Sequence, residues 1–262
     1  VAMLGVTGTT SATTLIDKDT FIDANSPVNE NYRIENGATL SVNGATTGNI
    51  TISDGHLAMN GGSVNLLYGE YGATADIADA TLKAVSLAGD SRLSRTVIEG
   101  QLITWLMNFS ATSISAQQFY AYETQSTVEK GYFEQTERMY AGAVYLTSSE
   151  GIFTDSVIKG IKTAVYLEGN GSVDLIRSSI WATEGSAFDI TRGNQQILLQ
   201  GSSASSQTGE LLVARTGSSV NLALDASHAA GDVRAEGSAV VDVALTNGSV
   251  LSGGMTNVNS LR

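Results

Sequence analysis

A four-residue word that recurs along the chain constrains its fold more than any other feature. The residues AVYL occupy positions 143–146 and occur again at 164–167. Farther on, VARTGSSV at 213–220 aligns with VRAEGSAV at 233–240. Units of this kind begin near residues 143, 164, 187, 211, 232 and 254. A spacing of about 21–24 residues is typical of solenoids, in which each repeat stacks on its neighbour.

Within these units, apolar and polar residues alternate with the period of two that marks a β-strand. Examples are VNLAL at 220–224 and VDVAL at 241–245, and similar runs lie at 39–42, 50–52, 57–59 and 64–66. Gly or Asn separates the runs about every seven to ten residues, which predicts about three strands per coil. Parallel crossovers are right-handed. The sequence therefore predicts an all-β, right-handed, single-stranded parallel β-helix (β-solenoid) of about ten to twelve coils, some 50 Å long.

Two other architectures explain the pattern less well. A leucine-rich repeat requires regular Leu-x-x-Leu-x-Leu runs, which this sequence lacks. A β-sandwich would not explain a word that returns at coil spacing. The 28 Gly and the single Pro27 suit many tight turns between strands. We therefore expect one β-helix domain over residues 1–262.

The charge of the chain limits its partners. The net charge is −12, whereas nucleic-acid binding first requires a basic face. The same charge disfavours polyanionic glycans as the main ligand. Cysteine is absent, which suits a chain that crosses an oxidising compartment unfolded. No apolar stretch has the length of a membrane span, and no signal peptide opens the sequence, so we expect a mature or excised segment.

Residues 101–141 depart from the pattern because they are rich in aromatic residues, and we expect an irregular coil or loop insertion there. One interpretation is a protruding aromatic patch that binds a sugar or a peptide. Its candidate ligand-binding residues are Trp105, Phe119, Tyr120, Tyr122, Tyr132, Phe133 and Tyr140. The other interpretation is that longer coils need larger side chains to fill their core. An amphipathic helix across 115–130, ended by Gly131, is a further possibility.

Few residues are candidates for catalysis or for metal binding. Asp76 and Asp79 are close in sequence, with a spacing that more often belongs to a structural turn than to a catalytic pair. His56 and His228 lie far apart, so we expect each to be a solvated turn residue, and we predict no metal site and no cofactor. The residues GDSR at 89–92 begin like a serine-protease elbow but lack its final Gly. We expect no enzymatic activity, with a polysaccharide lyase or glycoside hydrolase as the alternative.

One family resemblance follows from particular words. The run YRIENGATLSVNG at 32–44 and the Gly-Ser words at Gly62, Gly171, Gly217 and Gly237 resemble the opening coils of pertactin-like passenger domains of Gram-negative autotransporters (type V secretion). The resemblance implies display at the cell surface, from an outer-membrane β-barrel outside this segment. It also implies a role in adhesion, self-aggregation or biofilm formation. The implied partner is a host matrix protein, a glycan, or the same passenger on another cell. An inert structural stalk is a further alternative.

Overall fold

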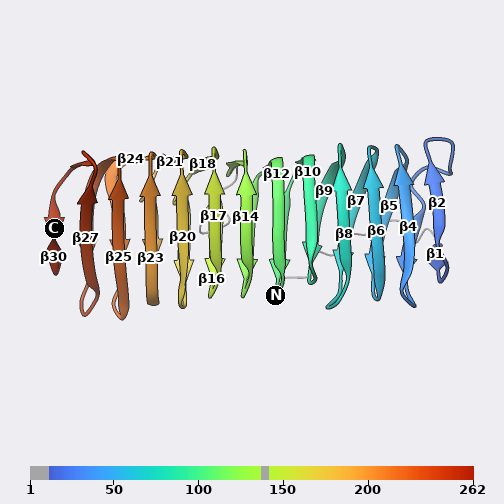
Figure 1. Ribbon diagram of the computed structural model, residues 1–262, viewed down its shortest axis with the longest axis horizontal. Coiled ribbons are helices and arrows are strands. Elements are labelled where there is room, and N and C mark those ends of the chain that lie inside the picture. The colour runs from blue at the N-terminus through green and yellow to red at the C-terminus, as the bar shows by residue number, and fades with distance from the viewer. Residues whose placement is uncertain (1–11, 137–141) are drawn as a thin grey trace.

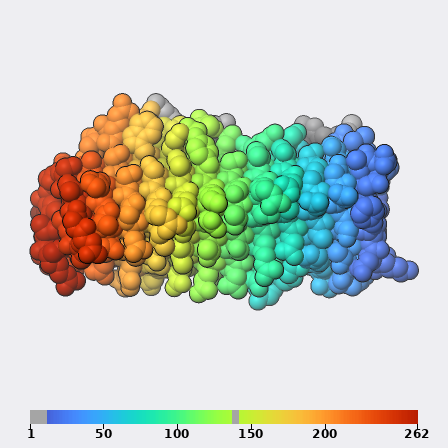
Figure 2. Space-filling view, turned by 45° about the horizontal axis from the view of Figure 1, so that its top comes forward, coloured from blue at the N-terminus to red at the C-terminus, as the bar shows by residue number. Residues whose placement is uncertain are grey.

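The chain forms a parallel β-solenoid of about 12 turns. The structure is a computed structural model that describes residues 12–136 and 142–262, and these residues contain thirty strands and no helix. Figure 1 shows the strands side by side in chain order along the long axis, from β1 and β2 at one end to β30 at the other. The space-filling view in Figure 2 shows the resulting rod. All the strand pairings among the described residues are parallel, which confirms the predicted fold class.

The strands form three ladders, which we call faces 1, 2 and 3. Face 1 contains β1 (Thr13–Ile16), β3 (Asn31–Ile34), β5 (Thr46–Ile52), β7 (Ser63–Gly69), β9 (Thr81–Leu87), β11 (Gln101–Trp105), β13 (Gln118–Tyr122), β16 (Val144–Thr147), β19 (Val165–Glu168), β22 (Phe188–Ile190), the C-terminal parts of β24 (Ser203–Ala214) and β26 (His228–Ala235), and β29 (Met255–Thr256).

Face 2 contains β2 (Thr20–Asp23), β4 (Ala38–Asn43), β6 (Gly55–Asn60), β8 (Thr74–Ala78), β10 (Ser91–Ile98), β12 (Asn108–Ala116), β14 (Gln125–Glu129), β17 (Glu150–Thr154), β20 (Gly171–Ile176), β23 (Gly193–Gln200), β25 (Ser218–Asp225), β27 (Val240–Thr246) and β30 (Ser260–Leu261). Face 3 contains the first residues of β5, β7 and β9, the last residues of β10 and β12, then β15 (Tyr132–Glu134), β18 (Val157–Gly160), β21 (Ser179–Ala182), the first residues of β24 and β26, and β28 (Val250–Ser252).

The coils come in two lengths, and the change occurs after Phe119. On face 1, Leu102 pairs with Phe119 in a short coil, whereas Phe119 pairs with Val144 in a longer one. All the coils before this step are short, and those after it are longer until the last pairing, of β27 with β30. The period predicted from the repeated words therefore describes the C-terminal half, and the N-terminal coils use less chain per turn.

Residues 101–134 continue the stack as regular strands. The irregular insertion expected at 101–141 is therefore limited to the segment after Glu134. β11, β13 and β16 pair in register, as do β12, β14 and β17. The possible helix across 115–130 is wrong, because this stretch holds the end of β12, all of β13 and all of β14. In β14, buried Ser126 and Val128 alternate with exposed neighbours, a strand period rather than a helical one. The added length lies between Glu134 and Val144, and residues 137–141 of it lie outside the described residues.

The core is filled by the inward side chains of all three faces. Near the step in coil length it contains four fully buried phenylalanines, which are Phe109, Phe119, Phe133 and Phe153. Their ring centroids lie 5.5 to 6.0 Å apart, within the usual range for aromatic pairs. Large aromatic rings thus fill the interior where the shorter coils meet the longer ones.

A ladder of buried hydroxyls closes the corner between faces 2 and 3 in the longer coils. The backbone N–H of Ser156 donates to Ser178 Oγ at 3.0 Å, and the N–H of Ser178 donates to Ser202 Oγ at 2.9 Å. The series continues through Ser227 to Ser249, at 3.0 and 3.1 Å. Because an unpaired buried N–H is costly, each serine stabilises the coil that precedes it.

Candidate functional site

The predicted aromatic residues lie partly on the surface of face 1. Tyr120, Tyr145 and Tyr166 stand in register on neighbouring strands, and we call them the tyrosine stack. Their ring centroids are 4.5 Å apart at each step, with interplanar angles of 13° and 16°. Trp105 extends the stack, since its ring lies 6.2 Å from that of Tyr120 and 5.7 Å from that of Tyr122. The structure therefore brings Trp105, Tyr120 and Tyr122 together, all half-buried.

This stacking limits what the tyrosines offer to a ligand. Tyr145 has a tyrosine ring on each side, so both of its faces are occupied and its edge faces outward. Its hydroxyl donates to Glu168 at 2.6 Å, and burial together with this carboxylate raises the pKa of Tyr145. The Trp105 indole N–H donates to Ser86 Oγ at 3.2 Å. The stack stabilises the coils, and ligand binding at Trp105, Tyr120 and Tyr122 stays a prediction.

The other candidates do not join them. Phe119 and Phe133 are wrong as ligand-binding residues, because both have an exposure of 0% within the core. For these two, the core-filling interpretation is correct. Tyr132 lies on face 3, where its hydroxyl accepts a hydrogen bond from Lys159 Nζ at 2.9 Å. Tyr140 lies outside the described residues.

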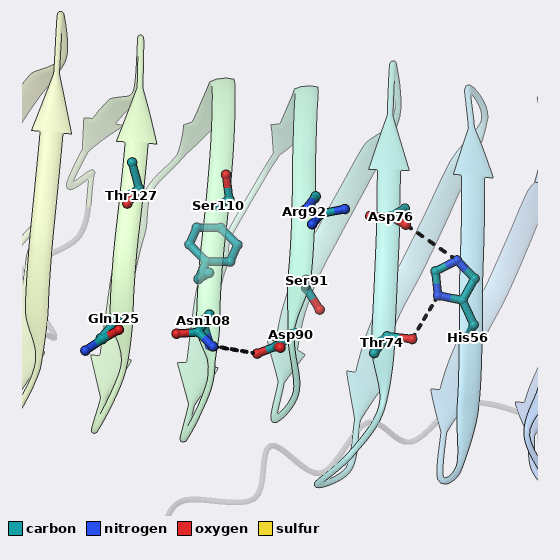
Figure 3. Close-up of a pocket in the computed structure, with 11 residues that line it drawn as sticks. His56, Thr74, Asp76, Asp90, Ser91, Arg92, Asn108, Ser110, Gln125 and Thr127 are labelled. Atoms are coloured by element: carbon teal, nitrogen blue, oxygen red, sulfur yellow. Dashed lines mark hydrogen bonds and ion pairs between the residues drawn. The ribbon is translucent and has the colours of Figure 1, made fainter.

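A polar groove on face 2 is the best candidate for a functional site. One part of it is a hollow of about 630 Å³ that crosses β6, β8, β10, β12 and β14. It is lined by His56, Thr74, Asp76, Asp90, Ser91, Arg92, Asn108, Phe109, Ser110, Gln125 and Thr127 (Figure 3). A second hollow of about 700 Å³ shares Asp76, Arg92 and Ser110 with the first and extends toward Phe21.

Strand alternation and register put these side chains together. Asp76 pairs with Arg92, Arg92 with Ser110, and Ser110 with Thr127, so the four form one outward row across adjacent coils. His56 and Thr74 are partners in a parallel row. The sequence did not reveal this groove, because the coils that build it are shorter than the repeated words indicated. Aligning the N-terminal runs at the shorter spacing would have revealed the rows.

The histidines and the two aspartates considered in the sequence take unexpected positions. His56 lies within β6, not in a turn, and its Nδ1 lies 2.8 Å from Thr74 Oγ1. Its Nε2 lies 3.7 Å from Asp76 Oδ2. Asp76 lies on β8, so the turn expected to contain both Asp76 and Asp79 holds only Asp79 (φ 54°). The expected turn position of His228 is also wrong, because it begins β26.

The remaining polar groups of the groove differ in how many hydrogen bonds and ion pairs they make within the chain. Asp90 accepts hydrogen bonds from the backbone N–H and the side-chain amide of Asn108, at 3.0 and 3.2 Å. Arg92 is exposed, and among the described residues it has no ion-pair partner. A shallow hollow of hydroxyl, amide and charged groups suits a ligand rich in hydroxyl groups.

Ion pairs elsewhere on the surface have a structural role. Arg95 holds the pKa of Asp79 below its usual value by a side-chain hydrogen bond, and Arg177 does the same for Asp155. Both pairs join adjacent coils at a corner. Over residues 12–136 and 142–262, the structure shows no cluster of three metal-ligating side chains. In the same ranges no helix has the length and apolar character needed to cross a membrane.

Comparison with known proteins gives no relative for this chain. No family model matches it, and the searches of curated proteins and of solved structures found no match. The resemblance to autotransporter passengers therefore rests on the sequence words and on the solenoid fold.

Proposed function

We propose that this chain is the passenger of a Gram-negative autotransporter and that it acts in adhesion, self-aggregation or biofilm formation at the cell surface. The observation that supports this most is face 2. It runs along the whole solenoid, and its N-terminal half carries a long groove whose part across β6 to β14 is lined mainly by polar side chains. A rod with a polar flank presents its binding groups to the side, where another cell or a matrix can reach them.

Shallow grooves of this kind bind weakly at each contact. Hydrogen bonds between exposed groups contribute about 0.5–1.5 kcal/mol each. Display of many copies on one cell multiplies such contacts, because each bound copy raises the effective concentration for the next. The partner proposed here is a host matrix protein, a glycan, or the same chain on another cell. The supporting β-barrel would lie outside this segment.

Display on cells tests this proposal. Cells of a non-adherent strain that display the chain should settle faster, or bind more to immobilised matrix proteins or glycans, than cells that display an unrelated rod at equal density. Equal settling and equal adhesion to fibronectin, collagen and a glycan panel would contradict the proposal. A chain that only holds another domain at a distance would also give this negative result.

One observation favours a second function. Asp76, Asp90 and His56 line the same hollow, and paired carboxylates are the usual groups for glycoside hydrolysis. A polysaccharide-cleaving enzyme would release reducing ends, and Asp76→Asn or Asp90→Asn would abolish the release. Absence of new reducing ends across a polysaccharide panel would remove this alternative and leave binding alone.

A further inference from the structure

We propose that the face 2 groove binds a carboxylated sugar residue, with the Arg92 guanidinium receiving the carboxylate. This inference rests on the proposed adhesive function, because it names the ligand class of the same groove.

The strongest support is the contrast between Arg92 and six other arginines within the stack. Among the described arginines, only Arg262, the last residue of the sequence, likewise makes no ion pair. The guanidinium groups of Arg33, Arg95, Arg177, Arg192, Arg215 and Arg234 each contact a carboxylate of this chain. Arg92 has Asp76 as its register partner on the preceding coil, yet the two side chains make no ion pair, and the Asp76 carboxylate instead lies 3.7 Å from His56 Nε2. Arg92 thus keeps its donors available in a chain whose net charge is −12.

The position of Arg92 in the groove also fits this role. It lines both hollows, and Figure 3 shows it between Asp76 and Ser110. The planar guanidinium group donates two parallel hydrogen bonds, a geometry that matches a carboxylate. A ligand that lies along the rod would therefore meet Arg92 wherever it crosses the middle of the groove.

The neighbours of Arg92 supply the groups that recognise sugar hydroxyls. Ser110 and Thr127 continue its row toward the C-terminus, while Asn108 and Gln125 form the adjacent row. Hydroxyl and amide groups both donate and accept, so they suit a hydroxyl-rich chain. Asp76 and Asp90 would accept from hydroxyls but repel a second anion close by. The chemistry therefore fits a glycan whose carboxylates are spaced apart, and it disfavours a densely sulfated one.

The test uses the full chain and two variants that each lose one positive charge. Arg92→Gln removes the proposed carboxylate ligand. Lys83→Gln is the matched control, because Lys83 is exposed and is absent from the groove lining. The probes are a trisaccharide with a single terminal glucuronic acid and its carboxyl-reduced counterpart, which has the same length and linkage. Binding is measured by calorimetry, and circular dichroism checks that each variant is folded.

We expect the wild-type chain and Lys83→Gln to bind the glucuronic acid trisaccharide equally. We expect Arg92→Gln to bind it at least about tenfold more weakly, because it loses the charge-assisted hydrogen bonds to the carboxylate. The carboxyl-reduced probe should bind all three proteins with the same reduced affinity. Equal binding of both probes to the wild-type chain, or equal affinity of Arg92→Gln and Lys83→Gln, would overturn the proposal. So would the absence of binding to the wild-type chain.

Failure of this inference differs from failure of the adhesive function. If displayed Arg92→Gln cells adhere as well as wild-type cells, adhesion stands and the role of Arg92 falls. If neither adheres or clumps while the purified chain still binds the glucuronic acid trisaccharide through Arg92, the groove is a sugar site and the adhesive function falls.

Discussion

Neighbouring residues on β13 take opposite roles. Phe119 points inward and packs on Phe109 and Phe133, whereas Tyr120 points outward and stacks on Tyr145. The two differ by one position, and successive side chains of a strand point to opposite sides of the sheet. The choice of residue agrees with the side, because a buried tyrosine would need a partner for its hydroxyl.

Acid should weaken one corner pair in a predictable direction. Arg177 donates two hydrogen bonds of 2.8 Å to the Asp155 carboxylate, and these bonds lower the pKa of Asp155. The pKa is lower in the folded chain than in the unfolded chain. The stabilisation is therefore present above the unfolded value near 3.8 and is lost as the pH falls through the folded value.

The variant Arg177→Gln should accordingly melt below the wild-type chain at pH 7, with the difference shrinking as the pH falls below 3.8. Thermal denaturation followed by circular dichroism at pH 7, 5, 3 and 2 measures this. Lys83→Gln serves as the control, whose difference from wild type should not follow this pH course. A constant difference for Arg177→Gln at all four pH values would show that the ion pair does not contribute.

The aromatic cluster also shows how far the sequence predicts the site. Composition alone located Trp105 and Tyr120 near one another, because a run of aromatic residues is visible without a structure. Which rings lie inside depends on where each strand begins, and a shift of one residue exchanges the two sides. Arg92 and His56 carry no local signal at all. They line the same groove only because of the register across the short coils, whose period the repeated words did not display.

At the scale of the element, the close spacing of coils places strict demands on certain glycines. Gly62 and Gly217 share a φ of +86°, in the left-handed region. A Cβ added at Gly62 would overlap the backbone of Ala45 in the adjacent coil, whereas one at Gly217 would meet nothing within 4 Å. The two positions therefore separate the cost of the backbone conformation from the cost of contact between coils.

We expect Gly217→Ala to destabilise the chain by about 1–2 kcal/mol, the cost of a side chain in the left-handed region. Gly62→Ala should cost about 1–3 kcal/mol more, because the neighbouring backbone must move. Urea denaturation with a shared slope gives both values. Equal destabilisation by the two variants would mean that the backbone at Ala45 moves away from the added methyl group of Gly62→Ala without a measurable cost in stability.

At the scale of the whole molecule, the solenoid has few contacts between distant coils. Each inner strand of face 2 pairs with the coil before it and the coil after it. Stability in such arrays is close to a sum of repeat and interface terms. The repeated words were enough to predict this architecture and about three strands per coil, since they carry the period directly. They did not predict the change in coil length after Phe119, because the words occur only in the longer coils.

Removal of one complete coil should therefore leave a folded rod. Deletion of residues 157–178 joins Ser156 to Ser179. Ser179 pairs with Val157 in the ladder, so it takes the position that Val157 leaves. We expect a β-sheet circular dichroism spectrum, a cooperative melt at lower temperature and unchanged sugar binding at Arg92. Deletion of residues 157–167, about half a coil, should abolish the cooperative melt because inward and outward positions no longer match. Equal behaviour of the two deletions would contradict a register-dependent stack.

The serine ladder at the corner of faces 2 and 3 gives the rod a polarity. Each donor N–H belongs to one coil, and the hydroxyl that accepts its hydrogen bond belongs to the following coil. A coil that docks on the N-terminal side of an existing stack finds its acceptor already in place. A coil that docks on the C-terminal side leaves its own N–H waiting for the next coil. Either addition forms one such bond, so the ladder makes the two ends of the rod chemically different. At its C-terminal end the series stops at Ser249, whose own N–H donates to Thr246 O at 3.0 Å.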